Sequence, residues 1–266
     1  MSSQTRDPQL AFATEVLLTG TNPADDAAAL TPALLTHEVV RMRVDEAPSD
    51  FRAYYDSLVE ALGTPIEIAE DYATGGAPTG ERWAEIRYDA DIPDMAAFRH
   101  SKNAQPFHTD ESYVSSPAGI MLFYCENAAP SGGETNYISG QALVEHLRAN
   151  RPELLEALLT TNVRFEKAQD YKDRPIIVID DEGRVDLNYN YYCADLNQGV
   201  AALELNQQFL DYLHNELPPE SVLSIQLAPG ESAAWRDDRV LHGRNAFEAH
   251  HTNDRLIWKT GVVLPA

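Results

Sequence analysis

Cysteine is scarce in this chain of 266 residues, which contains only Cys125 and Cys193. Two cysteines far apart cannot build a disulfide framework, and no paired-cysteine spacing typical of a zinc site is present. We therefore expect two free, buried thiols in a protein from a reducing compartment.

Long apolar runs are also lacking. No stretch approaches the ~20 residues that a membrane-spanning helix needs. The first ten residues carry polar and charged side chains instead of the apolar centre of a signal peptide, and we expect residues 1–10 to form a loose N-terminal arm. The sequence predicts a cytoplasmic protein without a membrane partner.

Positive charge is in short supply. The chain has 20 Lys and Arg residues against 42 Asp and Glu residues, a formal net charge of −22. Such a field repels phosphate backbones, which argues against nucleic acid as a partner. A well-solvated surface is the simplest interpretation, and steering of a cationic substrate is the alternative. The oligomeric state stays open, a homodimer included.

Apolar residues, in contrast, make up 44% of the chain, enough for a sizeable core. We expect one domain over residues 1–266. Many short strand-like segments, such as the apolar run Gly119–Tyr124, alternate with turn signals, and helical spacing appears at Phe51–Leu62 and Leu203–Leu217. This pattern predicts a mainly β fold, a barrel or jelly roll with helical decoration. The absence of a GxGxxG loop and of regular strand–helix alternation argues against a Rossmann fold.

A candidate metal site begins at His108 and Asp110, which are separated by one residue. On an extended strand, residues i and i+2 point to the same face, so an imidazole and a carboxylate can converge on one ion. With one further imidazole they form the ligand set of non-haem Fe(II) oxygenases, which leaves positions open for reactants. Taken alone, such a triplet is weak evidence, because most instances are surface hydrogen-bonded pairs.

The C-terminal segment supplies the third imidazole. His242 is expected at a strand end, where barrels present ligands. His214 lies on a predicted helix, and His250 and His251 lie in a polar loop, so surface positions suit all three better. Thirteen residues beyond His242, Arg255 offers a two-point fork for a dicarboxylate, although a surface ion pair is the commoner explanation of an isolated arginine.

Four segments in a fixed order resemble the TauD/TfdA superfamily of Fe(II)- and 2-oxoglutarate-dependent dioxygenases. They read PFHTDESY, GIMLFYCENAAPSGGETNYIS, WRDDRVLHGRN and NDRLIWKTGV. The resemblance implies a double-stranded β-helix and the cofactors Fe(II), 2-oxoglutarate and O₂. It also implies that iron is held by His108, Asp110 and His242, and that Thr135 and Arg255 bind the far carboxylate of 2-oxoglutarate. Halogenating relatives carry Gly or Ala where this chain has Asp110, which favours hydroxylation.

The HTDESY-like segment is similar to that of compact superfamily members that act on free cationic amino acids, above all lysine. A small-molecule substrate of this kind is therefore expected. Glu111 follows Asp110 and needs a bend in the strand to reach the pocket. The candidates for the substrate amine are Glu111 and Asp91, and those for its carboxylate or for the pocket wall are Trp83, Arg87 and Trp258. For each of these five, a core or surface position is the alternative.

Three other interpretations stay open. A desaturating or cyclising oxygenase of a natural-product pathway would use the same iron site. A non-catalytic metal- or sugar-binding jelly roll would need no dicarboxylate anchor. A zinc hydrolase would need a ligand set richer in histidine. The carbon attacked and the stereochemistry are not specified by the sequence.

Overall fold

The computed structural model describes residues 11–67, 80–92, 98–115, 119–167 and 169–265. The expected N-terminal arm lies outside these ranges. Every helix within these ranges is too short or too polar to span a bilayer. The cytoplasmic location stays a prediction.

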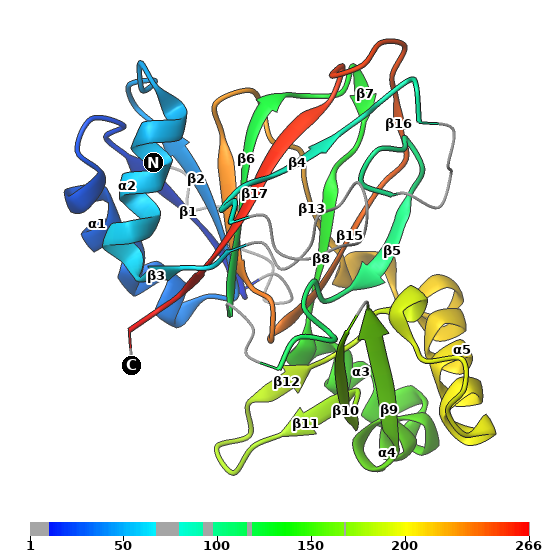
Figure 1. Cartoon of the computed structure of the whole chain (residues 1–266). Coiled ribbons are helices and arrows are strands. Elements are labelled where there is room, and N and C mark those ends of the chain that lie inside the picture. The colour runs from blue at the N-terminus through cyan, green and yellow to red at the C-terminus, as the bar shows by residue number, and fades with distance from the viewer. Residues whose placement is uncertain (1–10, 68–79, 93–97, 116–118, 168, 266) are drawn as a thin grey trace.

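Two β-sheets face each other and form the body of the molecule (Figure 1). The larger sheet contains, in spatial order, β1 (Ala13–Leu18), β2 (Val39–Val44), β14 (Ser232–Arg236), β6 (Ile120–Asn127), β17 (Leu256–Val263) and β3 (Thr64–Pro65), with β4 (Ala84–Arg87) also paired to β17. The smaller sheet contains β13 (Leu223–Ile225), β8 (Thr135–Ser139), β15 (Val240–Arg244) and β5 (Gln105–His108). The predicted mainly β jelly roll with helical decoration is confirmed.

Strand β6 shows why its sequence is almost continuously apolar. Met121 and Phe123 point between the two sheets, where they pack with Tyr137 and Trp235. Leu122, on the opposite face of the strand, belongs to a second core beneath the N-terminal helices. Successive side chains alternate between faces, and both faces are covered from Ile120 to Cys125, so these six positions are apolar or aromatic. Glu126 and Asn127 follow where the strand becomes more exposed.

The second core is closed by α1 (Pro23–Thr36) and α2 (Phe51–Leu62), which lie side by side over the outer face of the larger sheet (Figure 1). Asn22 and Asp50 cap these helices, each accepting a hydrogen bond from a backbone N–H of the first turn. Helix α2 begins and ends where its apolar spacing predicts.

A third core lies at the other end of the smaller sheet. Three helices surround it: α3 (Gly140–Asn150), α4 (Pro152–Thr160) and α5 (Val200–Asn215). Two hairpins complete it, β9 (Asn162–Lys167) with β10 (Asp170–Pro175) and β11 (Ile177–Ile179) with β12 (Val185–Leu187). The remaining short elements are β7 (Ser131–Gly132), which pairs with β16 (Phe247–Glu248), and the 3₁₀ turns η2 (Tyr191–Cys193) and η3 (Pro219–Ser221).

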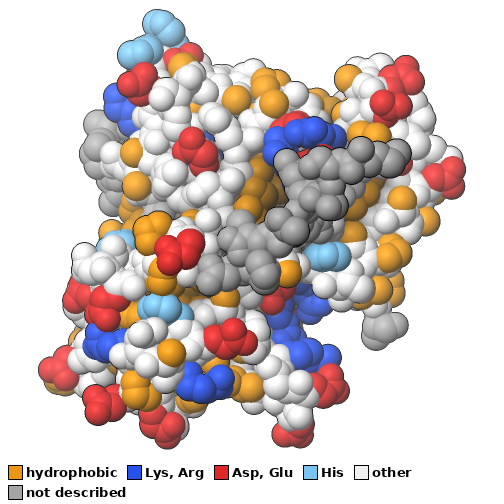
Figure 2. Space-filling view, turned by 180° about the vertical axis from the view of Figure 1, so that it is seen from behind, with side chains coloured by type: hydrophobic (Ala, Val, Ile, Leu, Met, Phe, Trp, Pro, Cys, Tyr) orange, Lys and Arg blue, Asp and Glu red, His pale blue; other side chains and the backbone are white. Residues whose placement is uncertain are grey.

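Two smaller expectations can be compared with this fold. Both cysteines are free, Cys125 buried and Cys193 partly so. On the face shown in Figure 2, acidic side chains are spread over the surface instead of forming one patch, in keeping with the solvated-surface interpretation of the charge.

Candidate active site

The two imidazoles meet across the smaller sheet, where His242 of β15 is the direct partner of His108 of β5. Their ring centroids are 4.2 Å apart. The expected position of His242 at a strand end is wrong: it is the third of five residues of β15, and all five are buried. The reason is that β15 pairs on both sides, with β5 and with β8, so its centre lies inside the sheet.

Asp110 reaches the imidazoles from a turn and not from a continuing strand. Strand β5 ends at His108, so the expected i/i+2 geometry on one strand does not apply. The backbone N–H of Thr109 donates to the carbonyl of Tyr189 at 2.7 Å, and its hydroxyl accepts from the N–H of Tyr189 at 3.1 Å. These bonds hold the turn in place and let the carboxylate of Asp110 fold back toward the two rings.

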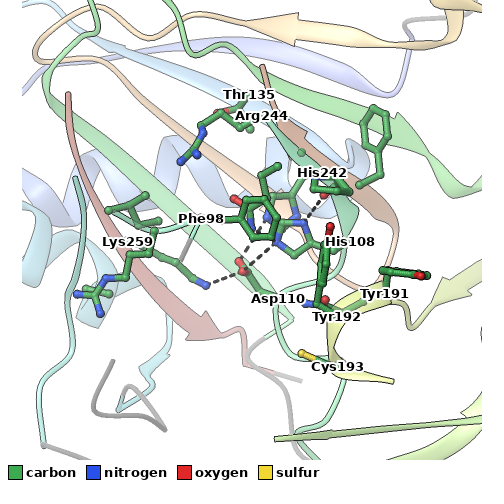
Figure 3. A pocket seen from close by; sticks show the side chains of 18 of the residues that line it. Phe98, His108, Asp110, Thr135, Tyr191, Tyr192, Cys193, His242, Arg244 and Lys259 are labelled. Atoms are coloured by element: carbon green, nitrogen blue, oxygen red, sulfur yellow. Dashed lines mark hydrogen bonds and ion pairs between the residues drawn. The ribbon is translucent and has the colours of Figure 1, made fainter. Parts of the chain in front are cut away.

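The three side chains converge on one point. Asp110 Oδ1 lies 3.7 Å from His108 Nε2, and Asp110 Oδ2 lies 3.6 Å from His242 Nε2. Figure 3 shows both rings turned toward this carboxylate. One potential ligand atom from each residue lies within 4.8 Å of the others. Two imidazoles and one carboxylate are the donors of a facial Fe(II) site, and Asp110 Oδ2 is buried without a hydrogen-bond partner among the described residues, as a metal ligand would be.

The Nδ1 atoms of both rings face acceptors, which leaves Nε2 for a metal. His108 Nδ1 donates to the carbonyl of Pro106 at 2.9 Å. His242 Nδ1 lies 3.5 Å from Asp237 Oδ1. The side-chain nitrogen of Gln105 lies 3.1 Å from His108 Nε2. It occupies the side of the ring on which the Nε2 lone pair would bind a metal. The arrangement is that of histidines prepared for coordination.

Electrostatics favours the protonation states that a metal requires. Burial alone would raise the pKa of Asp110, but Lys259, whose Nζ lies 2.7 Å from Oδ1, and the two imidazoles outweigh it and hold the pKa well below its ordinary value. Burial, and next His108, lowers the pKa of His242 well below its usual value. The carboxylate is therefore charged and the His242 imidazole neutral, as coordination demands. Burial, and next the charge of Asp110, raises the pKa of Asp237.

A second group of side chains that could hold an anion lines the same cavity, which measures about 490 Å³. Thr135, Arg244 and Arg255 line it and are each about 95% buried. Arg255 Nη1 and Arg244 Nε have no hydrogen-bond partner among the described residues. Burial lowers the pKa of Arg255 to about 10, and burial together with Arg255 lowers that of Arg244 to about 9. Two buried cations with unused N–H groups fit a carboxylate.

Gly133 makes room for this anion site. It has φ +81°, a backbone conformation that residues other than glycine rarely adopt. A Cβ on it would lie 3.2 Å from Arg255 Nε. The Gly-Gly pair before Thr135 therefore lets the chain pass close to the guanidinium.

A comparison with known proteins decides the family. The model of the taurine catabolism dioxygenase TauD, TfdA family matches residues 4–260, nearly the whole chain. The chain belongs to this family. The resemblance predicted from the four motifs is thereby confirmed, and the family is one of dioxygenases.

Individual relatives are more distant. The chain is 28% identical over 157 residues to human gamma-butyrobetaine dioxygenase, covering 54% of this chain and 40% of that protein. It is 26% identical over 212 residues to uridine-5'-phosphate dioxygenase of an Amycolatopsis species, covering 73% of this chain and 74% of that protein. The chain thus spans less than half the length of the gamma-butyrobetaine dioxygenases that it matches.

Solved structures support the fold of this TauD-family chain. An asparagine oxygenase in complex with Fe(II), 2S,3S-3-hydroxyasparagine and succinate superposes with a TM-score of 0.68 at 14% identity, covering 90% of this chain and 78% of that one. A taurine dioxygenase from Burkholderia xenovorans superposes with a TM-score of 0.66 at 16% identity, covering 95% and 88%.

The five predicted substrate residues of this TauD-family chain do not line the cavity. Trp83 and Trp258 lie on the opposite face of the larger sheet, where both pack against Arg52 of α2 and donate to carboxylates. The reason for Trp258 is strand alternation: its neighbour Lys259 faces the cavity, so Trp258 points away.

The other three lie at the margin of the fold. Arg87 is paired with Glu85 and Asp89. Asp91 is exposed, and Glu111 is half-buried with its charge acting on Asp237. No substrate contact follows from these positions, and substrate roles for the five residues remain untested predictions.

Aromatic rings occupy another part of the cavity. Phe98 and Tyr192 have ring centroids 5.2 Å apart, as do Tyr191 and Tyr192. In Figure 3, Tyr191, Tyr192 and Cys193 are drawn below His108. Phe98 precedes β5 in the chain, and the two tyrosines follow β12. No sequence motif indicates that these two segments meet.

Sequence reasoning missed several polar residues of the site. Arg244 had a usable signal, because it follows His242 by two positions and so shares its face of β15. The sequence signal for Lys259 was weaker: it lies four residues beyond Arg255, on the same predicted strand. Asp237 had none, since a turn carboxylate two residues after a tryptophan has no typical role.

Proposed function

We propose that this chain is an Fe(II)- and 2-oxoglutarate-dependent oxygenase that hydroxylates an unactivated C–H bond of a small polar substrate. A free cationic amino acid, with lysine as the first candidate, is the proposed substrate. One observation carries the proposal: a two-histidine, one-carboxylate cluster shares one cavity with a pair of buried arginines suited to a dicarboxylate.

Each residue has a definite task. His108, Asp110 and His242 would hold Fe(II), and Thr135 and Arg255, with Arg244 beside them, would hold the far carboxylate of 2-oxoglutarate. The bound metal, 2-oxoglutarate and O₂ supply the oxidation of the C–H bond, with succinate and CO₂ as co-products. The protein keeps this chemistry dry and orients the target carbon. A non-catalytic metal-binding module would have no need of the arginine pair.

Charge and aromaticity support an amino-acid-like substrate. Lys259 provides an ammonium beside Asp110 that can attract a substrate carboxylate. The rings of Phe98, Tyr191 and Tyr192 can attract a substrate ammonium through their π faces. The relatives include gamma-butyrobetaine and trimethyllysine dioxygenases, whose named substrates carry both groups.

The test is turnover with a substrate panel. Purified protein with Fe(II) and 2-oxoglutarate is incubated with the twenty amino acids, gamma-butyrobetaine, trimethyllysine and uridine-5'-phosphate, and succinate is followed. We expect succinate above background with a cationic amino acid, and a product heavier by one oxygen. A product lighter by two hydrogens would indicate a desaturase. Succinate formation with uridine-5'-phosphate alone would overturn the substrate class.

A matched pair of histidine variants tests the site itself. His242→Ala should abolish substrate-dependent succinate formation, because it removes one of three ligands. His214→Ala, on the exposed side of α5, should leave the rate unchanged. Equal activity in the two variants would refute the assignment of His242.

A further inference from the structure

We infer that Asp237 is a positioning residue that orients His242 and anchors the turn of Asp110, so that one buried carboxylate sets the geometry of two metal ligands. The inference rests on the proposed function, and it concerns a residue that touches neither substrate nor metal. Asp237 lies in the tight turn between β14 and β15 and is only 4% exposed.

One oxygen of Asp237 holds the ligand turn. Its Oδ2 accepts a hydrogen bond from the backbone N–H of Asp110 at 2.8 Å and a longer one from that of Glu111 at 3.4 Å. The N–H of Asp237 in turn donates to the carbonyl of Gly119 at 3.0 Å. The position of Asp110 therefore depends on a residue more than 120 positions away in the sequence.

The other oxygen faces the histidine. Asp237 Oδ1 accepts from Trp235 Nε1 at 3.1 Å and lies 3.5 Å from His242 Nδ1. That nitrogen is buried and has no hydrogen-bond partner among the described residues. His242 directs its Nε2 at Asp110, so Nδ1 carries the proton and needs an acceptor on this side. A small tightening of the contact would give the carboxylate–histidine–metal arrangement, which fixes the tautomer and ring orientation of a ligand.

All four groups around Asp237 are N–H donors: two backbone amides, an indole and an imidazole. A carboxylate can accept from all of them, since both of its oxygens are acceptors. An asparagine of the same shape cannot, because its NH₂ must face donors on one side. Asp237→Asn therefore keeps the volume of the side chain but disrupts either the ligand turn or the histidine.

The experiment compares this variant with a neighbour. Asp238→Asn is the matched control, because the carboxylate of Asp238 pairs with Arg236 and Arg239 and is partly exposed. Dissociation constants for Co(II) and, without oxygen, for Fe(II) are measured by titration of wild type and both variants. We expect metal binding by Asp237→Asn to be weaker by roughly 10–100-fold, the usual effect of losing such a partner, and that by Asp238→Asn to stay within twofold.

The outcomes separate the two proposals. A wild-type protein that binds neither metal would overturn the proposed function. Wild-type binding together with unchanged affinity in Asp237→Asn would overturn the inference and leave the function standing. A merely structural role would lower the melting temperature of the variant without weakening metal binding by its folded form.

A second measurement needs no variant and so covers the case in which Asp237→Asn does not fold. In the zinc-loaded wild type with ¹⁵N-labelled histidine, NMR reports the protonation of each ring nitrogen. We expect His242 to carry a slowly exchanging proton on Nδ1 with the metal on Nε2. A metal on Nδ1, or an Nδ1 proton in rapid exchange with water, would overturn the inference.

Discussion

At the scale of single residues, the two buried arginines make the sharpest prediction. Arg255→Gln should raise the dissociation constant of 2-oxoglutarate by about 10–100-fold, because hydrogen bonds to a charged group are worth about 1.5–3 kcal/mol and 1.4 kcal/mol is tenfold. The measurement is a 2-oxoglutarate titration of the Fe(II)-loaded protein without oxygen. The control is Arg87→Gln, which removes an arginine paired outside the cavity.

Arg244→Gln should have the smaller effect of the two. Two backbone carbonyls, of Ser101 and Asn103, already engage its Nη2 at 3.0 and 2.7 Å, so less of its hydrogen-bonding capacity is left for a ligand. Unaltered 2-oxoglutarate binding in both arginine variants would show that the anion site lies elsewhere.

A third prediction concerns Glu38 and the stability of the protein. Burial raises its pKa to about 7 from an ordinary 4.5, although Ser139 and Arg239 act in the opposite direction. Between these values the native state binds more protons than the unfolded state, so the free energy of unfolding falls as the pH rises through this window. Glu38→Gln should stabilise the protein by roughly 1–3 kcal/mol at pH 8 and by little at pH 5.

Urea unfolding at both pH values measures this effect. Glu145→Gln, a change at an exposed position of α3, is the control and should alter stability at neither pH. A Glu38→Gln variant that gains nothing at pH 8 relative to pH 5 would show that Glu38 is well solvated in solution.

Sequence motifs decide which of the single residues could be predicted. The three candidate iron ligands, Thr135 and Arg255 belong to motifs that can be recognised in the sequence alone. Asp237 lies in the same motif as His242, but its contact with the turn of Asp110 could not be predicted, because it joins segments that meet only in the folded chain. The same holds for the contacts of the aromatic rings. The orientation of Trp258 could not be predicted either, because the sequence of an apolar strand that is covered on both sides does not show which face of β17 lines the cavity.

At the scale of elements, the pairing of β5 with β15 decides whether the two histidines meet. Gly243 of β15 lies against β5: a Cβ on it would come within 2.8 Å of the carbonyl oxygen of Gln105 and 3.3 Å of the backbone nitrogen of Phe107. Gly243→Ala should force the strands apart, destabilise the fold by about 1–3 kcal/mol, and weaken metal binding.

Two measurements check this prediction, urea unfolding for stability and Co(II) titration for the metal. The control is Gly199→Ala, at a position where a Cβ meets nothing within 4 Å. If Gly243→Ala bound Co(II) as tightly as wild type, the spacing of β5 and β15 would not control the site.

Element prediction succeeded where the local pattern is strong. Helix α2 has the expected bounds, since its apolar spacing and the capping Asp50 agree. The central position of His242 in β15 was not predicted, because a buried strand carrying His, Gly and Arg has the composition of a loop. The strand is polar because it carries residues of the candidate site. Strand propensity is a poor guide where charged groups occupy a sheet for a functional reason.

At the scale of the whole molecule, the cavity draws on both sheets and on the segments that connect them. The smaller sheet supplies the histidines, Thr135 and Arg244, and the larger sheet supplies Lys259. The fold class was predictable, because many short strands and a few amphipathic helices admit few architectures. The substrate was not, since the residues of the cavity wall come from segments whose approach depends on the complete fold.

The central claim is that His108, Asp110 and His242 bind Fe(II) and leave positions open for 2-oxoglutarate. The most direct test is the visible absorption of the protein with Fe(II), before and after 2-oxoglutarate is added without oxygen. The account predicts a new metal-to-ligand absorption band that saturates at one equivalent of iron, persists in His214→Ala, and is absent from His242→Ala. No band in the wild type, or an undiminished band in His242→Ala, would contradict it.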